Sequence, residues 1–288
     1  HKVCSSIPQT RDLTASLEAG FLAVRPSLRF ILDPLTQPLS WALDYTLLFF
    51  TTMPWWALVP LILFGSQYVT KSFRITFLVA LCFIFFLFTD HYTYAIQTLS
   101  IIFVCTILCT LIGIPIGILM SKKDSAQRII TPVLDMLQTL PTFVYLIPLI
   151  FLFKITEAKL YGLAIMFYSI VPVIRLTNLG IRLVDKNLIE AADAYGMSPR
   201  QKLINVEIPL ALPNIMAGVN QTIMMSLAMV VIASLVSAPG LGTLVLDGIN
   251  NLRLGVGFVA GFGIVVLAVI LDRISKTALA RIDESREI

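Results

Sequence analysis

Long apolar runs separated by short polar intervals make up this chain from residue 46 onward. Because about 20 apolar residues are needed to cross the hydrocarbon core of a bilayer, each run of that length predicts a membrane-spanning helix. The pattern predicts seven such helices, over residues 46–64, 73–89, 95–120, 129–153, 160–179, 213–237 and 256–274. We therefore expect an all-α integral membrane protein built as a polytopic helical bundle of about seven spans.

Residues 1–45 are more polar than the rest of the chain. An apolar stripe within them predicts an interfacial helix, whereas three prolines favour a flexible tail, and both interpretations stay open. The stripe consists of Leu28, Ile31, Leu32 and Leu35, and the prolines are Pro26, Pro34 and Pro38.

A charged interval at 186–213 is the longest polar stretch after residue 90. The spacing of Leu188, Ile189, Ala192 and Tyr195 predicts a short amphipathic helix. Gly196 follows at a position where positive φ is favourable, and Ser198 with Pro199 has the composition of a second helix start. Two short helices bent around Gly196 would form a compact knob presented to a partner in water. An ordinary solvated loop is the alternative.

Composition and charge place this interval relative to the membrane. Charged residues make up only 13% of the chain, against about 25% in soluble domains. When successive connections are assigned alternately to two sides, fourteen Lys and Arg fall on the side of the 180–212 loop, three fall in the opposite connections, and four lie in the N-terminal region. Because basic residues concentrate on the cytoplasmic side, this distribution predicts a cytoplasmic 180–212 loop and C-terminus, and an N-terminus outside.

No residue pattern for catalysis or metal binding emerges from the sequence. The chain shows no Ser/His/Asp set, no paired carboxylates in a plausible cleft and no Gly-rich phosphate loop with Lys, and its two histidines are His1 and His91. Cys105 and Cys109 share a helix face without a further ligand, and Cys4 stands alone. We expect no catalytic residue, no metal and no cofactor in this chain, so ATP-driven work would need another subunit.

Polar residues inside the predicted spans are the candidates for lining a translocation path, because polar groups are costly in lipid and usually face a bundle interior or a cavity. Gln138 and Thr139 lie in the fourth span, and Asn220 and Gln221 lie in the sixth beside Met224. Hydrogen bonding between helices and ordinary core packing are the alternatives.

The interval 186–213 resembles the EAA loop of ABC importer permeases, whose pattern is Glu-Ala-Ala, three residues, Gly, nine residues and Ile-x-Leu-Pro. Glu190, Ala191, Ala192, Gly196 and Pro209 match, while Val206 and Ile208 replace the other two aliphatic residues. In that family the loop is the coupling helix that docks in a cleft on the cytoplasmic ATPase. The resemblance implies a coupling role for Glu190, Ala191, Ala192, Asp193, Gly196, Met197, Ser198, Pro199, Val206, Ile208 and Pro209.

Several further segments, among them VYLIPLIFLF, IRLTNLGI, LPNIMAGVNQTIMMSLAMVVIAS and ILDR, resemble the membrane subunit of glycine betaine/proline importers. This likeness covers roughly residues 95–275, and Pro239 departs from the small residue usual in the family. It implies a type I ABC importer permease fold, with 95–275 as the core and its 180–212 coupling loop. From the apolar pattern and the charge distribution we expect 1–45 to be an extracytoplasmic tail, 46–94 the first two spans and 276–288 a cytoplasmic tail.

The same resemblance implies the partners and the cargo. A second permease copy, two cytoplasmic ATPases that bind ATP and magnesium, and an extracytoplasmic binding protein would assemble at a bacterial inner membrane. The cargo would be glycine betaine, proline betaine, choline, carnitine or trimethylamine N-oxide. A permease for another solute such as an amino acid is the alternative. A stand-alone secondary transporter is a further alternative, but it would need ionisable residues at mid-membrane, and the sequence has almost none. A membrane enzyme would need a His or carboxylate cluster at an interface, which is absent from the sequence.

Overall fold

The computed structural model describes residues 11–284, which form helices joined by short connections without any strand among them. The predicted all-α fold is therefore confirmed, while Cys4 lies outside the described residues. The α-helices are α1 (Arg11–Thr52), α2 (Trp55–Thr70), α3 (Phe73–Phe88), α4 (Tyr92–Lys122), α5 (Asp124–Thr139), α6 (Thr142–Leu152), α7 (Ala158–Arg182), α8 (Lys186–Ala194), α9 (Pro199–Lys202), α10 (Ile208–Ala233), α11 (Leu241–Asn250) and α12 (Leu254–Glu284). A π-helical turn, Leu203–Glu207, joins α9 to α10, and a 3-10 turn, Ser234–Val236, follows α10.

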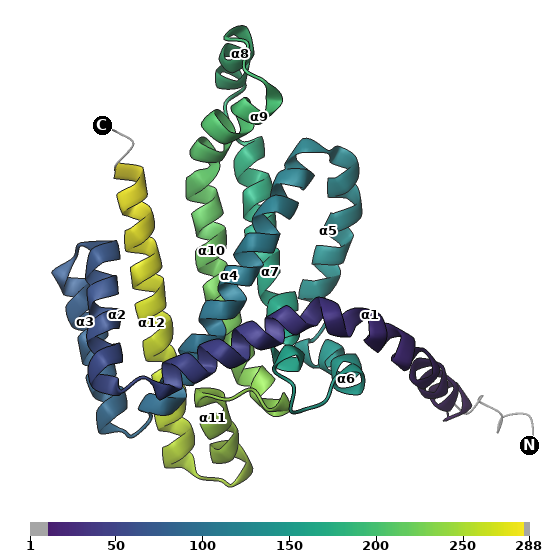
Figure 1. Ribbon diagram of the computed structural model, residues 1–288, viewed down its shortest axis with the longest axis vertical. Helices are drawn as coiled ribbons and strands as arrows, with labels where there is room; N and C mark the ends of the chain where they lie inside the picture. Colours follow the sequence, from purple (N-terminus) through teal and green to yellow (C-terminus); the bar gives the residue numbers. More distant parts are fainter. Residues whose placement is uncertain (1–10, 285–288) are drawn as a thin grey trace, which may run out of the picture.

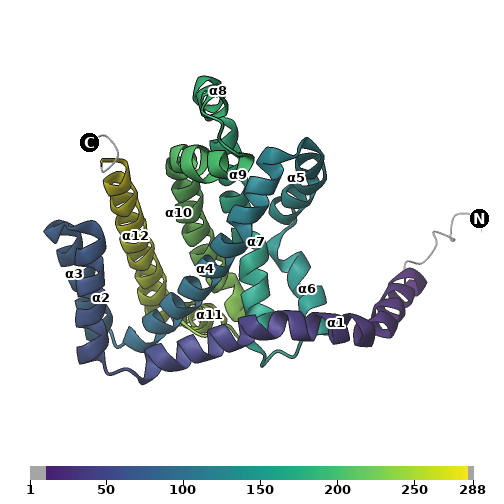
Figure 2. The ribbon, with the colours of Figure 1, turned by 45° about the horizontal axis from the view of Figure 1, so that its top comes forward.

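The bundle has two distinct ends. Helices α2, α3, α4, α5, α7, α10 and α12 run along its long axis, α1 lies across them, and α8 projects beyond one end (Figures 1 and 2). The α2–α3 and α4–α5 connections and the C-terminal end of α12 lie toward the end that carries α8, whereas α6 and α11 lie toward the opposite end (Figure 1). The connections that are rich in Lys and Arg thus share one end of the molecule. This agrees with the assignment of successive connections alternately to the two sides of a membrane.

Within residues 11–284, four helical runs are long and apolar enough to cross a membrane: α4, α7, Pro199–Val236 and Leu254–Ala278. The predictions at 95–120, 160–179, 213–237 and 256–274 fall on these runs. Two further pairs of helices would bring the number to six if each pair formed one broken span, and α3 is shorter, with 16 residues. Of the seven predicted positions, four therefore fall on single long helical runs, two fall on bent pairs and one falls on the shorter α3.

Two of the predicted spans cross sharp bends. The span over 46–64 crosses a bend of 112° between α1 and α2, and the span over 129–153 crosses a bend of 98° between α5 and α6. A proline, Pro54 or Pro141, is the N-cap after each break. Proline lacks an N–H group and disfavours helical geometry at the preceding residue, so a helix readily ends just before it.

Over residues 11–45 the chain forms helix α1 and not the flexible tail that was one interpretation, with three prolines inside a 42-residue helix; residues 1–10 lie outside the described part. Its inner face also differs from the predicted stripe. Leu28 and Leu32 pack against the main core and Leu43 is buried there, but Ile31 and Leu35 are 64% and 73% exposed. The predicted boundary at residue 45 lies inside α1.

An ion-pair network fastens α1 to the residues that open α7. Arg29 bonds Asp33 and Glu157, both at 3.0 Å, and Lys159 bonds Asp33 at 2.6 Å. The Lys159 side chain is only 5% exposed. Because each buried charge has an opposite partner, the network holds α1 across the bundle without leaving an unpaired charge.

Glycines let α4, α7 and α10 pack closely. A Cβ on Gly117 of α4 would lie 2.6 Å from Thr177 Cβ and 2.8 Å from the Ile174 carbonyl oxygen, both on α7. Gly113 lies one turn earlier on the same face, and Gly180 of α7 makes the same kind of close approach to α10. Small residues are the usual way for membrane helices to approach each other. This packing fixes α7 and α10, the two helices that carry the projecting segment.

Candidate functional site

The projecting segment begins with α8, and hydrogen bonds define both of its ends. The Asp185 side chain caps the helix by accepting a bond from the Asn187 N–H at 2.9 Å. At the other end, Gly196 has φ +74°, its N–H donates to the Asp193 carbonyl at 2.9 Å, and the Met197 N–H donates to the Ala192 carbonyl at 3.1 Å. These bonds form a Schellman motif, so the expected role of Gly196 as the residue that ends the helix is confirmed.

The second arm starts at Ser198 with a capping box. The Gln201 N–H donates to Ser198 Oγ at 3.3 Å, and the Ser198 N–H donates to Gln201 Oε1 at 2.9 Å, with Pro199 in the first turn. The expected helix start at Ser198 and Pro199 is confirmed. Sequence reasoning missed Gln201, although a Ser followed three residues later by Gln is a recognised signal.

This second arm is not a separate short helix, which corrects the expectation of two short helices. It continues through the π-helical turn into α10, so Pro209 lies near the start of α10 instead of ending the knob. A π-helical turn shifts the hydrogen-bond register from i+4 to i+5. Pro209, which lacks an N–H, therefore lies just after the π-helical turn, where the regular α-helical hydrogen bonds are already interrupted.

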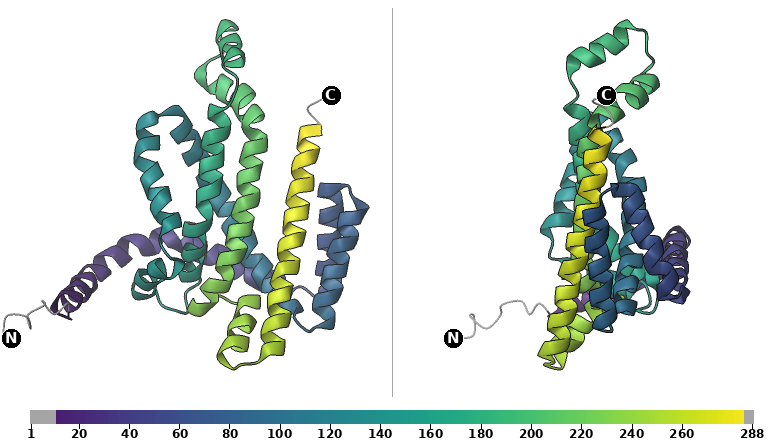
Figure 3. Two further views of the ribbon diagram at one scale, coloured as in Figure 1. Left: turned by 180° about the vertical axis from the view of Figure 1, so that it is seen from behind. Right: turned by 90° about the vertical axis from the view of Figure 1, so that its left-hand side faces the viewer.

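An ion pair joins the two arms. Lys202 Nζ lies 2.7 Å and 2.9 Å from the two carboxylate oxygens of Asp193. Together with the turn at Gly196, this contact defines the knob, by which we mean residues 185–207. The knob stands beyond the end of the bundle in both views of Figure 3.

The outer surface of the knob combines apolar side chains with exposed charge. Tyr195 is 85% exposed and Leu188 is 46% exposed, beside a shallow groove that Val206 and Leu210 line on the other arm. Of the residues assigned to coupling, Glu190, Ala191, Asp193, Gly196, Ser198 and Pro199 are exposed, Met197, Val206, Ile208 and Pro209 are half-buried, and Ala192 is buried. Exposed apolar side chains at a projecting tip are typical of a protein-docking surface. The coupling role itself stays a prediction.

The root of the knob is held by charges that the sequence analysis missed. Glu207, whose side chain is 3% exposed, forms an ion pair with Lys122 in the last turn of α4. Arg182, at the end of α7, donates to the Met120 carbonyl at 2.9 Å and to Asp124 at 2.7 Å. The knob is therefore connected to the α4–α5 turn as well as to its own two helices. A displacement of the knob would be transmitted to that turn.

The Lys122–Glu207 pair leads to an asymmetric prediction. Lys122→Met would leave the buried Glu207 carboxylate without its partner, and because Lys122 is 40% exposed we expect a loss of roughly 1–3 kcal/mol, less than for a fully buried pair. Glu207→Gln keeps a hydrogen-bonding group and leaves Lys122 free to be hydrated, so its loss should stay below about 1 kcal/mol. Thermal unfolding of the two variants in detergent measures the difference. An equal or larger loss in Glu207→Gln would contradict the pairing.

The residues assigned to the translocation path lie on two helices. Gln138 and Thr139 are exposed at the end of α5, just before the bend, and Gln221 is exposed on α10 with Met224 half-buried. Asn220 donates from Nδ2 to Asp272 of α12 at 3.2 Å. Asn220 thus makes the interhelical hydrogen bond that was the alternative interpretation, and the lining role of all five residues stays a prediction.

Residues 11–284 contain no group of three or more His, Cys, Asp or Glu placed to hold a metal ion. Cys82, Cys105 and Cys109 are buried free thiols, and the Cys109 sulfur lies 3.5 Å from Ser169 Oγ. The knob is therefore the most developed candidate site in this part of the chain, and its chemistry is that of protein docking.

Comparison with known proteins gives a consistent result. A family model described as "Binding-protein-dependent transport system inner membrane component" matches residues 110–283. The chain is 48% identical over 192 residues to the glycine betaine/proline betaine transport system permease protein ProW of Escherichia coli (strain K12), covering 67% of this chain and 54% of ProW. It is 41% identical over 232 residues to the glycine betaine/carnitine transport permease protein GbuB of Listeria monocytogenes, covering 79% of this chain and 81% of GbuB.

The fold has a solved counterpart. An inward-facing structure of the MetNI methionine ABC transporter matches with a TM-score of 0.60 at 18% identity, over 67% of this chain and 95% of the matched chain. At that identity the likeness establishes the fold alone, and it agrees with the expected importer permease architecture. The chain spans about half the length of ProW.

Proposed function

Because the chain belongs to the family of binding-protein-dependent transport system inner membrane components, we propose that it is the permease subunit of an ATP-driven importer. The single observation that supports coupling most directly is the knob. It projects beyond the bundle, is closed by a Schellman motif at Gly196 and presents exposed Glu190 and Ala191 at the end where basic connections gather. A docked ATPase would push the knob, and the knob would move α7 and α10.

The proposed assembly contains the partners that the chain itself does not supply. Two ATPase subunits would hold ATP and magnesium and bind the knobs in the cytoplasm, and a second permease copy, identical or paralogous, would complete the path. Exposed Gln138, Thr139 and Gln221 would then face the path, since exposed polar side chains on membrane helices are costly against lipid. The N-terminus would lie outside a bacterial inner membrane and the C-terminus in the cytoplasm.

The proposed cargo is a small quaternary or tertiary amine osmolyte. ProW and GbuB are named for glycine betaine together with proline betaine or carnitine. Choline and trimethylamine N-oxide share the same small, methylated and cationic or dipolar nitrogen centre. A binding protein outside the membrane would select among them and deliver the bound amine to the permease.

The test is ATP hydrolysis by the reconstituted complex. The chain would be co-expressed with its ATPase and binding-protein neighbours and placed in liposomes, with the binding protein empty or loaded with glycine betaine, choline or trimethylamine N-oxide. We expect one loaded form to raise ATP hydrolysis severalfold over the empty form. A stable complex stimulated only by an amino-acid-loaded binding protein would retain the architecture and reject the amine, and failure to form any complex would reject the importer.

A further inference from the structure

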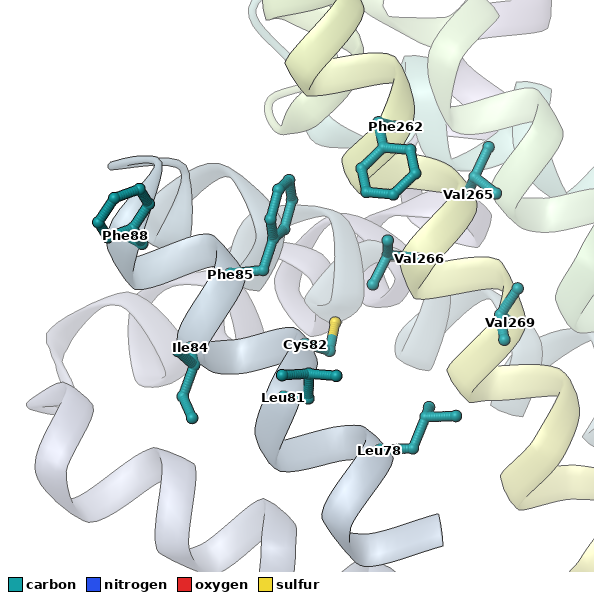
Figure 4. Close-up of a pocket in the computed structure, with 10 residues that line it drawn as sticks. All are labelled: Leu78, Leu81, Cys82, Ile84, Phe85, Phe88, Phe262, Val265, Val266 and Val269. Carbon is teal, nitrogen blue, oxygen red and sulfur yellow. The ribbon is translucent and has the colours of Figure 1, made fainter. Parts of the chain in front are cut away.

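A carbon-lined groove runs between α3 and α12 on the surface of the bundle (Figure 4). Its volume is about 550 Å³, and all ten side chains that line it are apolar. Leu78, Leu81 and Phe85 line it from α3, and Phe262, Val266 and Val269 line it from α12. Leu81 is 58% exposed and Val265, beside Val266, is 57% exposed. The groove is therefore a surface feature open to whatever surrounds the helices, not an internal core.

The inner faces of the same helices are already occupied. Phe83 and Phe86 of α3 and Leu267 of α12 belong to a buried core cluster that they form with α2. Gly263 brings α12 so close to α3 that an added Cβ would lie 2.8 Å from the Phe86 ring. Cys82, Leu78, Phe85 and Val266 line the base of the groove and also pack against this core. The rim is formed by exposed side chains, among them Leu81, Phe88 and Val265. Phe85 contacts Phe262 edge to face, with 5.5 Å between the ring centroids.

One end of the groove carries two arginines. Arg74 precedes Leu78 by four residues on α3, and Arg273 follows Val269 by four residues on α12. Residues four apart lie on the same face of a helix, one turn along it, so both arginines extend the two walls of the groove beyond the same end. Both are exposed, and neither has an ion-pair partner among the side chains that the structure describes.

The length of the groove fits one leaflet of a bilayer. From Leu78 to Phe88 the α3 wall rises about 15 Å at about 1.5 Å per residue, and one leaflet contributes about 15 Å to a hydrocarbon core of about 30 Å. The groove is therefore long enough for the acyl chain of one lipid. The two arginines would lie at the membrane surface, where basic side chains attract anionic lipid headgroups, and the groove would hold an apolar chain that descends from that surface.

We propose that the α3–α12 groove is a binding site for an anionic phospholipid, whose headgroup is bound by Arg74 and Arg273 and whose acyl chain lies along the groove. Charge complementarity favours this occupant over a second copy of the chain. The described carboxylate near that end, Asp272, is already engaged by Asn220 and by Lys276 at 2.9 Å, so a second copy would have to offer other acidic groups to two exposed arginines. The proposal requires only that the chain resides in a membrane, and does not depend on the cargo or the ATPase.

Native mass spectrometry of the purified full chain tests the headgroup contacts. Phosphatidylglycerol and phosphatidylcholine would be titrated separately against the wild type and the Arg74→Gln/Arg273→Gln variant. We expect the variant to lose roughly thirty-fold in apparent affinity for phosphatidylglycerol, since each basic residue near the surface contributes about a factor of five to ten, with phosphatidylcholine unchanged. Lys123→Gln/Arg128→Gln, which removes two exposed charges at the α4–α5 turn, is the matched control and should bind like the wild type. An equal loss in both variants would overturn the site in favour of general charge attraction.

A second pair of variants tests the acyl-chain groove while keeping both arginines. Val265→Trp and, separately, Leu81→Trp would fill the groove from positions exposed enough to accept a larger side chain. We expect each to weaken phosphatidylglycerol binding about as much as the arginine variant does, with an unchanged apparent Tm. Unchanged lipid binding in both filled variants would refute the groove. If the filled variants lose a dimer but keep their lipid in the same spectra, this face would be assigned to contacts between copies of the chain.

Discussion

Gly117→Leu is expected to prevent stable packing of α4 against α7. The first added atom would already lie 2.6 Å from Thr177 Cβ and 2.8 Å from the carbonyl oxygen of Ile174, which belongs to the backbone and cannot turn aside. Overpacking of a tight contact typically costs about 1–3 kcal/mol, and we expect the upper end or more here because a whole leucine must be accommodated. The measurement is the yield of monodisperse protein in detergent together with its apparent Tm.

Gly261→Ala in α12 is the matched control for this prediction. No atom lies within 4 Å of a Cβ built on Gly261. Alanine in the middle of a helix is favoured over glycine by about 0.5–1 kcal/mol, so this variant should keep or raise the apparent Tm. A Gly117→Leu protein with the yield and Tm of wild type would show that α4 and α7 do not approach as closely as the structure places them.

The apolar length of each run was sufficient to predict most of the membrane helices, but not which prolines break them. Pro115, Pro172 and Pro213 lie inside continuous helices, whereas Pro54 and Pro141 mark sharp bends. In a membrane bundle, neighbouring helices and side chains compensate for the hydrogen bond that a proline removes. Whether that compensation exists depends on packing, which the local sequence does not contain.

In the candidate site, too, some features could be predicted from the local sequence and others could not. Its local signals, the positive φ of Gly196 and the helix start at Ser198, were readable because they involve residues only a few positions apart. The partner of Glu207 is Lys122, 85 residues away, and only the packing of α4 against α10 brings the two together. A buried glutamate among apolar residues predicts that some cation lies near it, but the sequence offers several lysines and arginines in the same region.

Gly196→Asp is expected to weaken docking of the ATPase while leaving membrane insertion intact. Gly196 ends α8 at φ +74°, and nothing lies within 4 Å of a Cβ built there, so the new side chain would point into open space. The effect would come from its charge. A carboxylate at a helix C-terminus opposes the helix dipole, and it would stand beside Asp193 on a surface that also carries Glu190. We expect about a tenfold loss of ATPase co-purified with the chain, the equivalent of roughly 1.4 kcal/mol.

Gly196→Asn separates this charge effect from backbone strain. Asparagine and aspartate both tolerate positive φ better than other residues with side chains, so the two variants strain the turn about equally and differ in charge. We expect Gly196→Asn to retain most of the ATPase and of the transport activity in liposomes, with both variants inserted at wild-type levels. Equal losses in both variants would mean that the turn geometry alone governs docking. Full co-purification and transport in Gly196→Asp would mean that the tip of the knob does not contact the ATPase. At a docked surface, an added charge together with a strained turn would have to weaken binding of the ATPase.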